Sequence, residues 1–449
     1  MAGRVGIGSH RLCGGRGVAS DRVSKSRPQG TDTPTLEGLM TTLPRLLKES
    51  WTLVEDRADH LANYFYARLF LTDPNLRDMF PVQMTAQRSR LLGALVEAVQ
   101  TVDDPSKFDA YLGALGKDHR KFHVSPEQYG AVGTALIDAL RTYAGDRWTA
   151  EYEQAWHDGY DAIATRMLTG AAGDNHKPAF WHAEVLSHER RGKGDVAVFT
   201  CRPLSKYDFT AGQYASLECQ HQPRLWRSYS IANAPCADGT LEFHVRAPSI
   251  GWVSAALVRK LRVGDMIRVG PPTGTMTLDR QSTRDIVCVA GGTGLSPIKS
   301  LIEEYTRNNR TRWVHLFIGA KDHEDFYDEP ALRHLAGRYP RLSVVTACSN
   351  DPAYPGEQGN ICDVVERYGP WREHDFFVCG PPPMLNATLA ALAGMDVPPS
   401  RIRYDAMPDL PEHAQHDCRS EPPRRQDTGA RKSTAGAKRG KRSPGIPSP

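Results

Sequence analysis

The chain has 449 residues, 40% of them hydrophobic and 24% charged, which is ordinary for a folded protein of about three domains. No apolar run approaches the roughly 20 residues that span a bilayer, and no apolar segment follows the basic N-terminal residues, so we expect neither a membrane span nor a secretory signal. Nine cysteines without metal-ligand spacing favour free thiols and a cytoplasmic location.

The net charge of +4 belongs to the two ends of the chain. Residues 1–40 carry a net +3 and residues 411–449 a net +5, so the part between them carries −4. Both ends are rich in Gly, Ser, Pro, Arg and Lys and poor in large apolar residues, which predicts disordered tails. We interpret them as solvated; weak attraction to nucleic acid or membrane surfaces is the alternative. Met40 is a second candidate for the start of the protein.

Apolar residues recur at helical spacing from Leu43 to Leu168, which favours an all-α domain. Ser125 followed by Pro126 is typical of a helix start. The apolar stripes predict four helices, marked by Trp51, Val54, Leu61, Phe65 and Leu69; by Leu91, Leu92, Leu95, Val96 and Val99; by Tyr129, Val132, Leu136 and Leu140; and by Trp156, Tyr160, Ile163 and Met167.

His119 is the candidate metal ligand of this helical part. It follows Leu115 by four residues and Leu112 by seven, so the three share one helical face. A neutral imidazole on an apolar face suits an axial haem ligand. Taken by itself, a lone histidine at such a position is more often a core residue with satisfied hydrogen bonds than a ligand. His123 is a rival ligand, but it lies closer to the chain break at Val124-Ser125-Pro126.

After Pro178 the pattern changes to short strands between turns that contain Gly and Pro, which favours a small antiparallel β-barrel. After Arg284, buried strands alternate with helical stretches, which is typical of a doubly wound parallel sheet. The expected strands are 196–199, 214–217 and 241–245 in the barrel, and 285–290, 313–318, 342–346 and 376–379 in the sheet.

Two turns of the last part each follow a strand and open a helix. They are Gly291-Gly292-Thr293-Gly294-Leu295-Ser296-Pro297 and Cys379-Gly380-Pro381-Pro382-Pro383. Glycine lets the backbone approach a phosphate, and a helix N-terminus supplies N–H donors. Either turn alone is compatible with a structural role, but two on one sheet indicate a ligand across the carboxyl ends of the strands.

The helical part resembles the flavohaemoglobin family. The segment Lys117–Tyr129 matches that family's proximal-histidine stretch, and Phe65–Phe70 with Asp73–Leu76 matches its distal helix and the corner after it. The resemblance implies haem b with His119 as iron ligand. It also implies roles for Phe80, packed on the haem, for Tyr66, Gln87 and Leu91 on the oxygen side, and for Tyr129, which would orient His119.

One position departs from the family. Flavohaemoglobins carry a glutamate in the last helix that hydrogen-bonds near the proximal histidine, and the matching residue here is Ala171. Asp174 is the nearest acid, three residues later. Either Asp174 takes that place after a local shift, or the proximal ligand is less anionic, which would raise the haem potential.

The second half resembles the ferredoxin–NAD(P)+ reductase superfamily. The resemblance implies FAD and NAD(P)H as cofactors, with Arg227 at the FAD pyrophosphate, Tyr229 against the flavin ring and Ser230 near its reactive nitrogen. The implied cofactor-binding residues are Tyr214; Arg227, Ser228, Tyr229 and Ser230; Gly251, Trp252, Val253 and Ser254; Gly291, Gly292, Thr293, Gly294 and Pro297; and Cys379, Gly380 and Pro381.

Two features bear on the nicotinamide. Gly319-Ala320-Lys321-Asp322 contains no arginine cluster for a 2′-phosphate, so we expect NADH to be favoured. Met407 stands where flavohaemoglobins place an aromatic residue over the flavin, so access of the nicotinamide is expected to differ.

The whole pattern predicts a multidomain protein, with an all-α globin domain, an antiparallel β-barrel FAD domain and an α/β doubly wound NAD(P)-binding domain. The expected divisions are 1–42 (disordered tail), 43–176 (globin), 177–282 (FAD), 283–408 (NAD(P)) and 409–449 (basic disordered tail). The implied activity is nitric oxide dioxygenation, with NO and O2 as partners, in a monomer without a specific nucleic-acid partner. The alternatives are an NAD(P)H-dependent electron-transfer reductase, a haem-based gas sensor, and a structural helical domain without haem.

Overall fold

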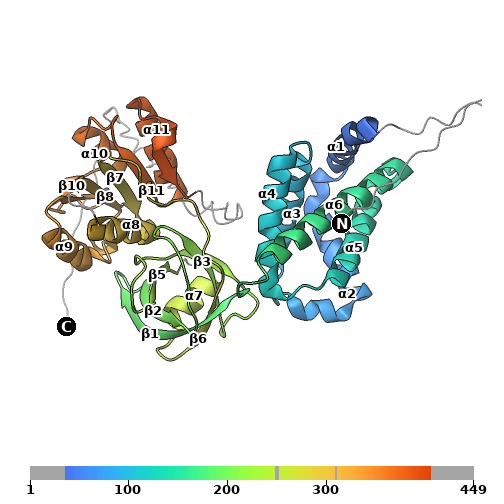
Figure 1. Ribbon diagram of the computed structural model, residues 1–449, viewed down its shortest axis with the longest axis horizontal. Helices are drawn as coiled ribbons and strands as arrows, with labels where there is room; N and C mark the ends of the chain where they lie inside the picture. The colour runs from blue at the N-terminus through green and yellow to red at the C-terminus, as the bar shows by residue number, and fades with distance from the viewer. Residues whose placement is uncertain (1–35, 248–251, 309–310, 406–449) are drawn as a thin grey trace, which may run out of the picture.

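The computed structural model describes residues 36–247, 252–308 and 311–405, and the barrel lies between the other two domains (Figure 1). We call the first part the helical domain. Its helices are α1 (Leu36–Thr52), α2 (Ala58–Thr72), α3 (Thr85–Thr101), α4 (Pro105–His119), α5 (Pro126–Ala144) and α6 (Ala150–Gly173). Ser125 caps α5 through a capping box with Gln128, as the Ser-Pro start signal predicted.

The apolar stripe from Trp51 to Leu69 is two helices, so the prediction of one helix was wrong. The 3₁₀ turn Glu55–Arg57 separates α1 from α2. Trp51, Val54 and Leu61 are all buried in the same core. Because both helices bury their apolar faces against that core, the spacing continues across the break and periodicity alone does not reveal it.

The N-terminal tail was expected to extend through residue 42, but α1 begins at Leu36. The backbone of residues 36–42 is therefore helical. Composition averaged over some forty residues cannot place the end of a predicted tail to within two helical turns, and the prediction for residues 1–35 lies outside the described residues.

The second part, which we call the barrel, confirms the predicted antiparallel architecture. Its strands are β1 (Trp181–Arg191), β2 (Val196–Pro203), β3 (Tyr214–Cys219), β4 (Arg227–Ser230), β5 (Leu241–Arg246) and β6 (Met266–Val269). They are ordered β4-β3-β6-β1-β2-β5, and Ile231 after β4 pairs with Phe243 of β5, which joins the two ends. The short helix α7 (Trp252–Arg259) packs on the barrel core.

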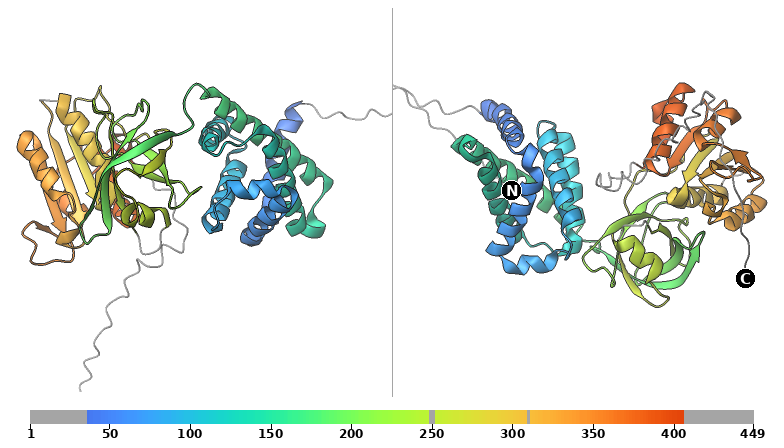
Figure 2. Two further views of the ribbon diagram at one scale, coloured as in Figure 1. Left: turned by 90° about the horizontal axis from the view of Figure 1, so that it is seen from below. Right: turned by 180° about the vertical axis from the view of Figure 1, so that it is seen from behind.

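The third part, the sheet domain, confirms the predicted parallel sheet. Its order is β10-β9-β8-β7-β11-β12, with helices on both faces (Figure 2). The elements are β7 (Ile286–Gly291), α8 (Leu295–Asn308), β8 (Val314–Ala320), α9 (Glu329–Arg338), β9 (Leu342–Cys348), β10 (Glu357–Gln358), α10 (Ile361–Tyr368), β11 (Asp375–Cys379), α11 (Pro382–Gly394) and β12 (Ile402–Tyr404). The chain order reverses between β7 and β11, so the ligand crevice is expected at their carboxyl ends.

The described residues also bear on two expectations from composition. None of their helices has the length and apolar character needed to cross a bilayer. The cysteines that they include are unpaired, and most are buried.

Candidate active site

His119 is the last residue of α4, and the 3₁₀ turn Arg120–Phe122 follows it directly. Its Nδ1–H donates to the carbonyl oxygen of Leu115 at 2.8 Å. Because a carbonyl only accepts, this bond fixes the proton on Nδ1 and leaves the lone pair on Nε2 for a metal. Burial lowers the pKa of His119 and outweighs the opposing effect of this hydrogen bond, so the ring is neutral at neutral pH.

The rival ligand, His123, faces the barrel. Its backbone is left-handed, with φ of 56°, and its ring lies 5.9 Å from the ring of Phe180, just before β1. It therefore belongs to the contact between domains and does not share the apolar face of Leu112 and Leu115.

The expected proximal acid has no substitute in Asp174. That carboxylate lies 3.4 Å from the Nζ atoms of both Lys117 and Lys177, at the C-terminal end of α6. The two lysines occupy it and lower its pKa against the effect of burial. The structure thus gives no support to Asp174 as the substitute, and the less anionic proximal ligand stays a prediction.

Direct backbone packing replaces the acid between α4 and α6. A Cβ on Gly116 would lie 1.9 Å from the carbonyl oxygen of Met167, and one on Gly170 would lie 2.4 Å from that of Gly113. No side chain fits at these contacts. Tyr129 packs into the adjoining core cluster with Met167, so it supports α4 by contact.

The distal candidates come together from three elements. Tyr66 of α2 is 6% exposed, and its O–H donates to the carbonyl oxygen of Gln87 on α3 at 3.4 Å. The Phe80 ring stands edge-on to the Tyr66 ring at 5.5 Å. Burial raises the pKa of Tyr66 to about 12, so it remains a hydrogen-bond donor. Leu91 lies one turn beyond Gln87 on α3.

The residues of the helical domain fit a haem. Five large apolar side chains on its helices and corner are only half-buried although they pack on the core: Phe80, Leu91, Leu92, Val96 and Leu115. A flat apolar group would cover their remaining surface. The neutral imidazole of His119, with Nε2 free, supplies the matching axial donor.

The flavin candidates are aligned by the pairing of β3 with β4. Tyr214 pairs with Ser230, and Leu217 with Arg227. The Tyr229 hydroxyl lies 2.9 Å from Ser254 Oγ on α7, and burial raises its pKa to about 12. The sheet pairing and this one bond thus connect the three flavin segments that the sequence singled out.

Arg227 is a half-buried cation whose pKa is lowered by burial. Its Nη1 donates to the carbonyl oxygen of Trp226 at 3.1 Å, and none of the ion pairs among the described residues uses its guanidinium. A pyrophosphate would meet this charge. The residues present therefore fit an anionic cofactor at β4.

The third flavin segment is described only from Trp252 onward, so Gly251 lies outside the described residues. Trp252 is 54% exposed at the start of α7, whereas Val253 is buried in the barrel core. Val253 therefore contributes its backbone and its packing to any flavin site.

The two glycine turns of the sheet domain touch each other. A Cβ on Gly294 would lie 2.2 Å from the carbonyl oxygen of Cys379, and one on Gly291 would lie 2.5 Å from Met384 Sδ. Gly292 has φ of 53°, in the left-handed region that favours glycine. Both turns thus form one edge at the carboxyl ends of β7 and β11. Thr293 and Pro297 lie on the first turn and the helix that follows, and Gly380 and Pro381 lie on the second.

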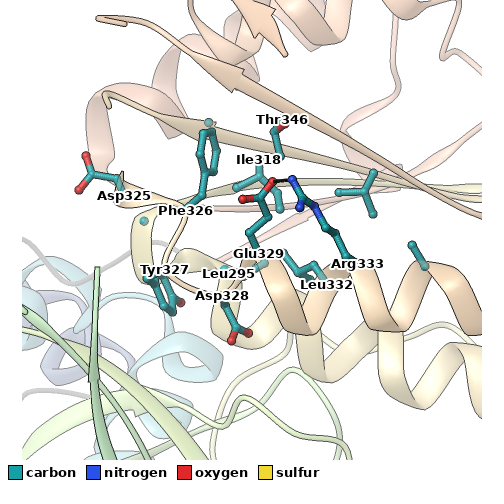
Figure 3. A pocket seen from close by; sticks show the side chains of 14 residues that line it. Leu295, Ile318, Asp325, Phe326, Tyr327, Asp328, Glu329, Leu332, Arg333 and Thr346 are labelled. Carbon is teal, nitrogen blue, oxygen red and sulfur yellow. Dashed lines mark hydrogen bonds and ion pairs between the residues drawn. The ribbon is translucent and has the colours of Figure 1, made fainter. Parts of the chain in front are cut away.

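A cavity of about 360 Å³ adjoins the first turn at Gly292. It lies against α9, between the ends of β8 and β9, and Figure 3 shows Phe326 above it and the Glu329–Arg333 ion pair at its side. The sequence prediction missed this segment. The run Asp322–Glu329 after β8 was the available signal, because loops at the carboxyl ends of parallel strands bind ligands.

Asp322 lies at the end of β8 but does not line the cavity. Its carboxylate pairs with Lys193 of the barrel at 2.5 Å. Met407 lies outside the described residues, so the structure does not bear on its place relative to the flavin.

Three families of known domains match the chain, in the same order as the three domains of the structure. Residues 63–167 match the globin family model, residues 185–278 the oxidoreductase FAD-binding domain and residues 288–389 the oxidoreductase NAD-binding domain. A flavohemoprotein of Bordetella pertussis is 26% identical over 389 residues, which cover 80% of this chain and 96% of the relative.

The reductase half has a further relative. The ferredoxin–NAD(P)+ reductase component of the naphthalene 1,2-dioxygenase/salicylate 5-hydroxylase systems of Ralstonia sp. is 36% identical over 217 residues. The match covers 47% of this chain and 64% of that relative. Among solved structures, a flavohemoglobin of Malassezia yamatoensis has the same fold, with a TM-score of 0.67 and 18% identity over 81% of this chain and 98% of its own.

A globin domain followed by FAD-binding and NAD-binding domains defines an oxidoreductase that uses haem, FAD and a nicotinamide cofactor. The chain is therefore similar to flavohaemoglobins in its three domains and in their order.

Proposed function

We propose that this protein is a flavohaemoglobin and acts as a nitric oxide dioxygenase. The balanced reaction is 2 NO + 2 O2 + NAD(P)H → 2 NO3− + NAD(P)+ + H+. The observation that supports it best is the contact of the flavin strands with the segment after His119, where Lys121 Nζ lies 3.4 Å from Ser216 Oγ of β3. When bound, FAD would accept a hydride and release single electrons, and haem would bind O2.

The residues of the helical domain have distinct tasks in this proposal. His119 holds the metal through Nε2, with its ring fixed by Leu115. Tyr66, kept protonated by burial, and the Gln87 amide donate hydrogen bonds on the opposite side, where negative charge develops on the substrate oxygen. Leu91 restricts the volume beside them.

The reductase residues bind and orient. Arg227 and the N-terminus of α7 neutralise the flavin pyrophosphate, and Tyr229, Ser230 and Tyr214 set the ring. The paired glycine turns at Gly291–Gly294 and Cys379–Pro381 receive the nicotinamide dinucleotide across the carboxyl ends of the strands.

NADH is the favoured donor within this proposal. Lys321 is the only basic side chain in the turn Gly319–Asp322 after β8. The neighbouring loop carries Asp325 beside the cavity, and Arg333, an arginine that lines it, is already paired with Glu329. A 2′-phosphate there would have to compete with Glu329 for that arginine and would be repelled by Asp325. The ratio of kcat/KM for NADH over NADPH tests this preference, and a ratio below one contradicts it.

A reductase for a separate acceptor is the second candidate function. It is favoured by the higher identity of this half to a dioxygenase reductase, 36%, than of the whole chain to a flavohemoprotein, 26%. In that case the globin would act as a gas sensor or as a minor electron acceptor.

The decisive experiment measures NO consumption by the purified holoenzyme with NADH under air, and haem reduction by NADH without oxygen. We expect NO consumption well above the autoxidation rate. Tyr66→Phe and Gln87→Ala should each lower it about tenfold or more, with NADH–ferricyanide turnover unchanged. Rapid haem reduction without NO consumption would overturn the proposal in favour of the second candidate.

A further inference from the structure

The loop Arg224–Trp226, just before β4, touches the helical domain at two separate places. Arg224 Nη1 donates to the carbonyl oxygen of Phe80 at 3.4 Å. Arg90 Nη2, on α3, donates to the carbonyl oxygen of Trp226 at 3.2 Å. One short loop therefore joins the barrel to the distal corner and to the distal helix.

The Trp226 side chain forms the centre of this contact. It is 4% exposed. Lys121 Nζ, from the helical domain, lies 5.1 Å from the Trp226 ring centroid, and Arg268 Cζ, from β6, lies 5.8 Å from it. A desolvated cation within about 6 Å of an indole ring is attracted by the ring's quadrupole. One cation from each domain thus holds the same ring.

Both cations are held by further contacts. Lys121 is 6% exposed, and its Nζ pairs with Asp118 at 2.5 Å. Arg268 pairs with Glu218, and its Cζ lies 5.3 Å from the Phe180 ring. The Phe180 and Trp226 ring centroids are 6.1 Å apart. The cations and rings therefore form a continuous packed group across the boundary.

The residues of this group are close in sequence to both candidate cofactor sites. Trp226 is adjacent to Arg227, the first residue of the flavin strand β4. Lys121 follows His119 by two residues, and the Phe122 ring lies 6.0 Å from the His119 ring and 5.3 Å from Lys121 Nζ. The same tryptophan thus connects the flavin strand with the segment that carries the proposed haem ligand.

We propose that Trp226 is a positioning residue that docks the helical domain on the barrel and so sets the rate of electron transfer from flavin to haem. The proposal rests on the proposed function only in taking flavin as donor and haem as acceptor. One electron leaves the reduced flavin and reduces the ferric iron, and the indole ring itself is neither oxidised nor reduced.

Three variants of the holoenzyme test the docking role. Trp226→Leu removes the ring, Trp226→Phe keeps a smaller one, and Lys121→Met removes one cation while leaving the tryptophan in place. Trp313→Leu is the matched control. Trp313 also has an arginine over its ring, Arg341 at 5.6 Å, but it lies in the sheet domain away from the helical domain and is 41% exposed.

Two measurements separate docking from a general effect on the reductase. In anaerobic stopped-flow experiments, flavin reduction by NADH should be unchanged, whereas the following haem reduction should slow about tenfold in Trp226→Leu and about threefold in Lys121→Met. Trp226→Phe should recover most of the rate. In the full chain, amide hydrogen exchange over residues 120–126 should become faster in the same order.

Wild-type haem reduction and wild-type exchange in Trp226→Leu and Lys121→Met would overturn the docking role. So would equal slowing of flavin and haem reduction, or an equal effect of Trp313→Leu. These readouts need no NO. If haem reduction responds as expected but NO is not consumed, only the proposed dioxygenase activity fails.

Discussion

The boundary between the barrel and the sheet domain is continuous with the interior of both. Val198 and Met276 from the barrel side belong to one buried cluster with Ile298, Leu301 and Ile318 of the sheet domain. By contrast, the buried clusters of the helical domain contain no residue of the barrel among the described residues. The two reductase domains therefore share a core, whereas the helical domain has its own.

Ion pairs also distinguish the two boundaries. At the barrel–sheet boundary, the buried Asp328 carboxylate pairs with Arg191 of β1 and lies 3.4 Å from Lys299 Nζ of α8. Lys299 also lies 2.6 Å from Glu242 of β5. Figure 3 shows Asp328 pointing away from the cavity, toward the barrel.

His244 completes that network. Its Nε2–H donates to Glu242 Oε1 at 2.8 Å, and its Nδ1 accepts from the Tyr327 hydroxyl at 2.9 Å. At the helical boundary, Arg224 is half-exposed and only 3.9 Å from the exposed Asp78. Buried, connected charges fix one geometry, whereas exposed pairs contribute little. The helical boundary therefore depends on the group around Trp226 and not on the Arg224–Asp78 pair, whereas the barrel and the sheet domain are joined by a shared core and a charge network.

The largest loss of activity should follow from His119→Ala. This variant tests whether haem binding can be abolished while the reductase keeps its activity. The variant should lose its haem Soret band, because the rival imidazole of His123 lies against Phe180 before β1, and NO consumption should fall to the autoxidation rate. NADH–ferricyanide turnover should remain at the wild-type level. A retained Soret band would show that His119 is not the ligand, and a parallel loss of ferricyanide turnover would show that the two halves are not separable.

Asp328→Ala should destabilise the reductase by about 3–5 kcal/mol, because it leaves the buried Lys299 without one of its counter-charges. Denaturant unfolding followed by flavin fluorescence measures this. The matched control at the other boundary is Asp78→Ala, whose exposed carboxylate should be worth less than about 0.5 kcal/mol. Similar losses for the two variants would remove the distinction between the boundaries.

Glu242 makes the barrel–sheet boundary sensitive to acid. Burial alone would raise its pKa, but the hydrogen bond from His244 and the charge of Lys299 together lower it from 4.5 to about 2. A lowered pKa in the folded state gives stability that is present above pH 4.5 and is lost as the pH falls toward 2. The loss amounts to about 3 kcal/mol.

The measurement for Glu242 is the free energy of unfolding of the reductase at a series of pH values. Glu242→Gln should be less stable at pH 6 and should flatten the curve between pH 4.5 and 2. An unchanged slope in this variant would place the acid sensitivity elsewhere.

Elements that depend on residues a few positions apart could be predicted from the sequence. The strand-turn-helix at Gly291–Gly294 and the helix start at Ser125-Pro126 are set by residues a few positions apart, and both fall where they were expected. The break at Glu55–Arg57 was missed because two helices share one core, which makes the apolar spacing continuous.

Contacts between distant segments could not be predicted. Nothing local in Lys121 or Trp226 shows that they meet, because they are 105 positions apart and belong to different domains. The same holds for the pair of Asp174 with Lys117, which depends on how α4 packs against α6, whereas Lys177 is only three residues from Asp174. The residue types were visible in the sequence, but their partners depend on tertiary packing.

The smallest effect should come from Arg224→Ala, which weakens the helical boundary at its edge. The side chain is half-exposed and makes one long hydrogen bond, to Phe80, so the stability of either half should change by less than about 0.5 kcal/mol. Anaerobic haem reduction should slow by no more than about threefold, and less at high salt, because screening already weakens the exposed charges of the wild type. A loss of reductase stability as large as that of Asp328→Ala would mean that the globin is part of the rigid unit, and that docking is not a separate step.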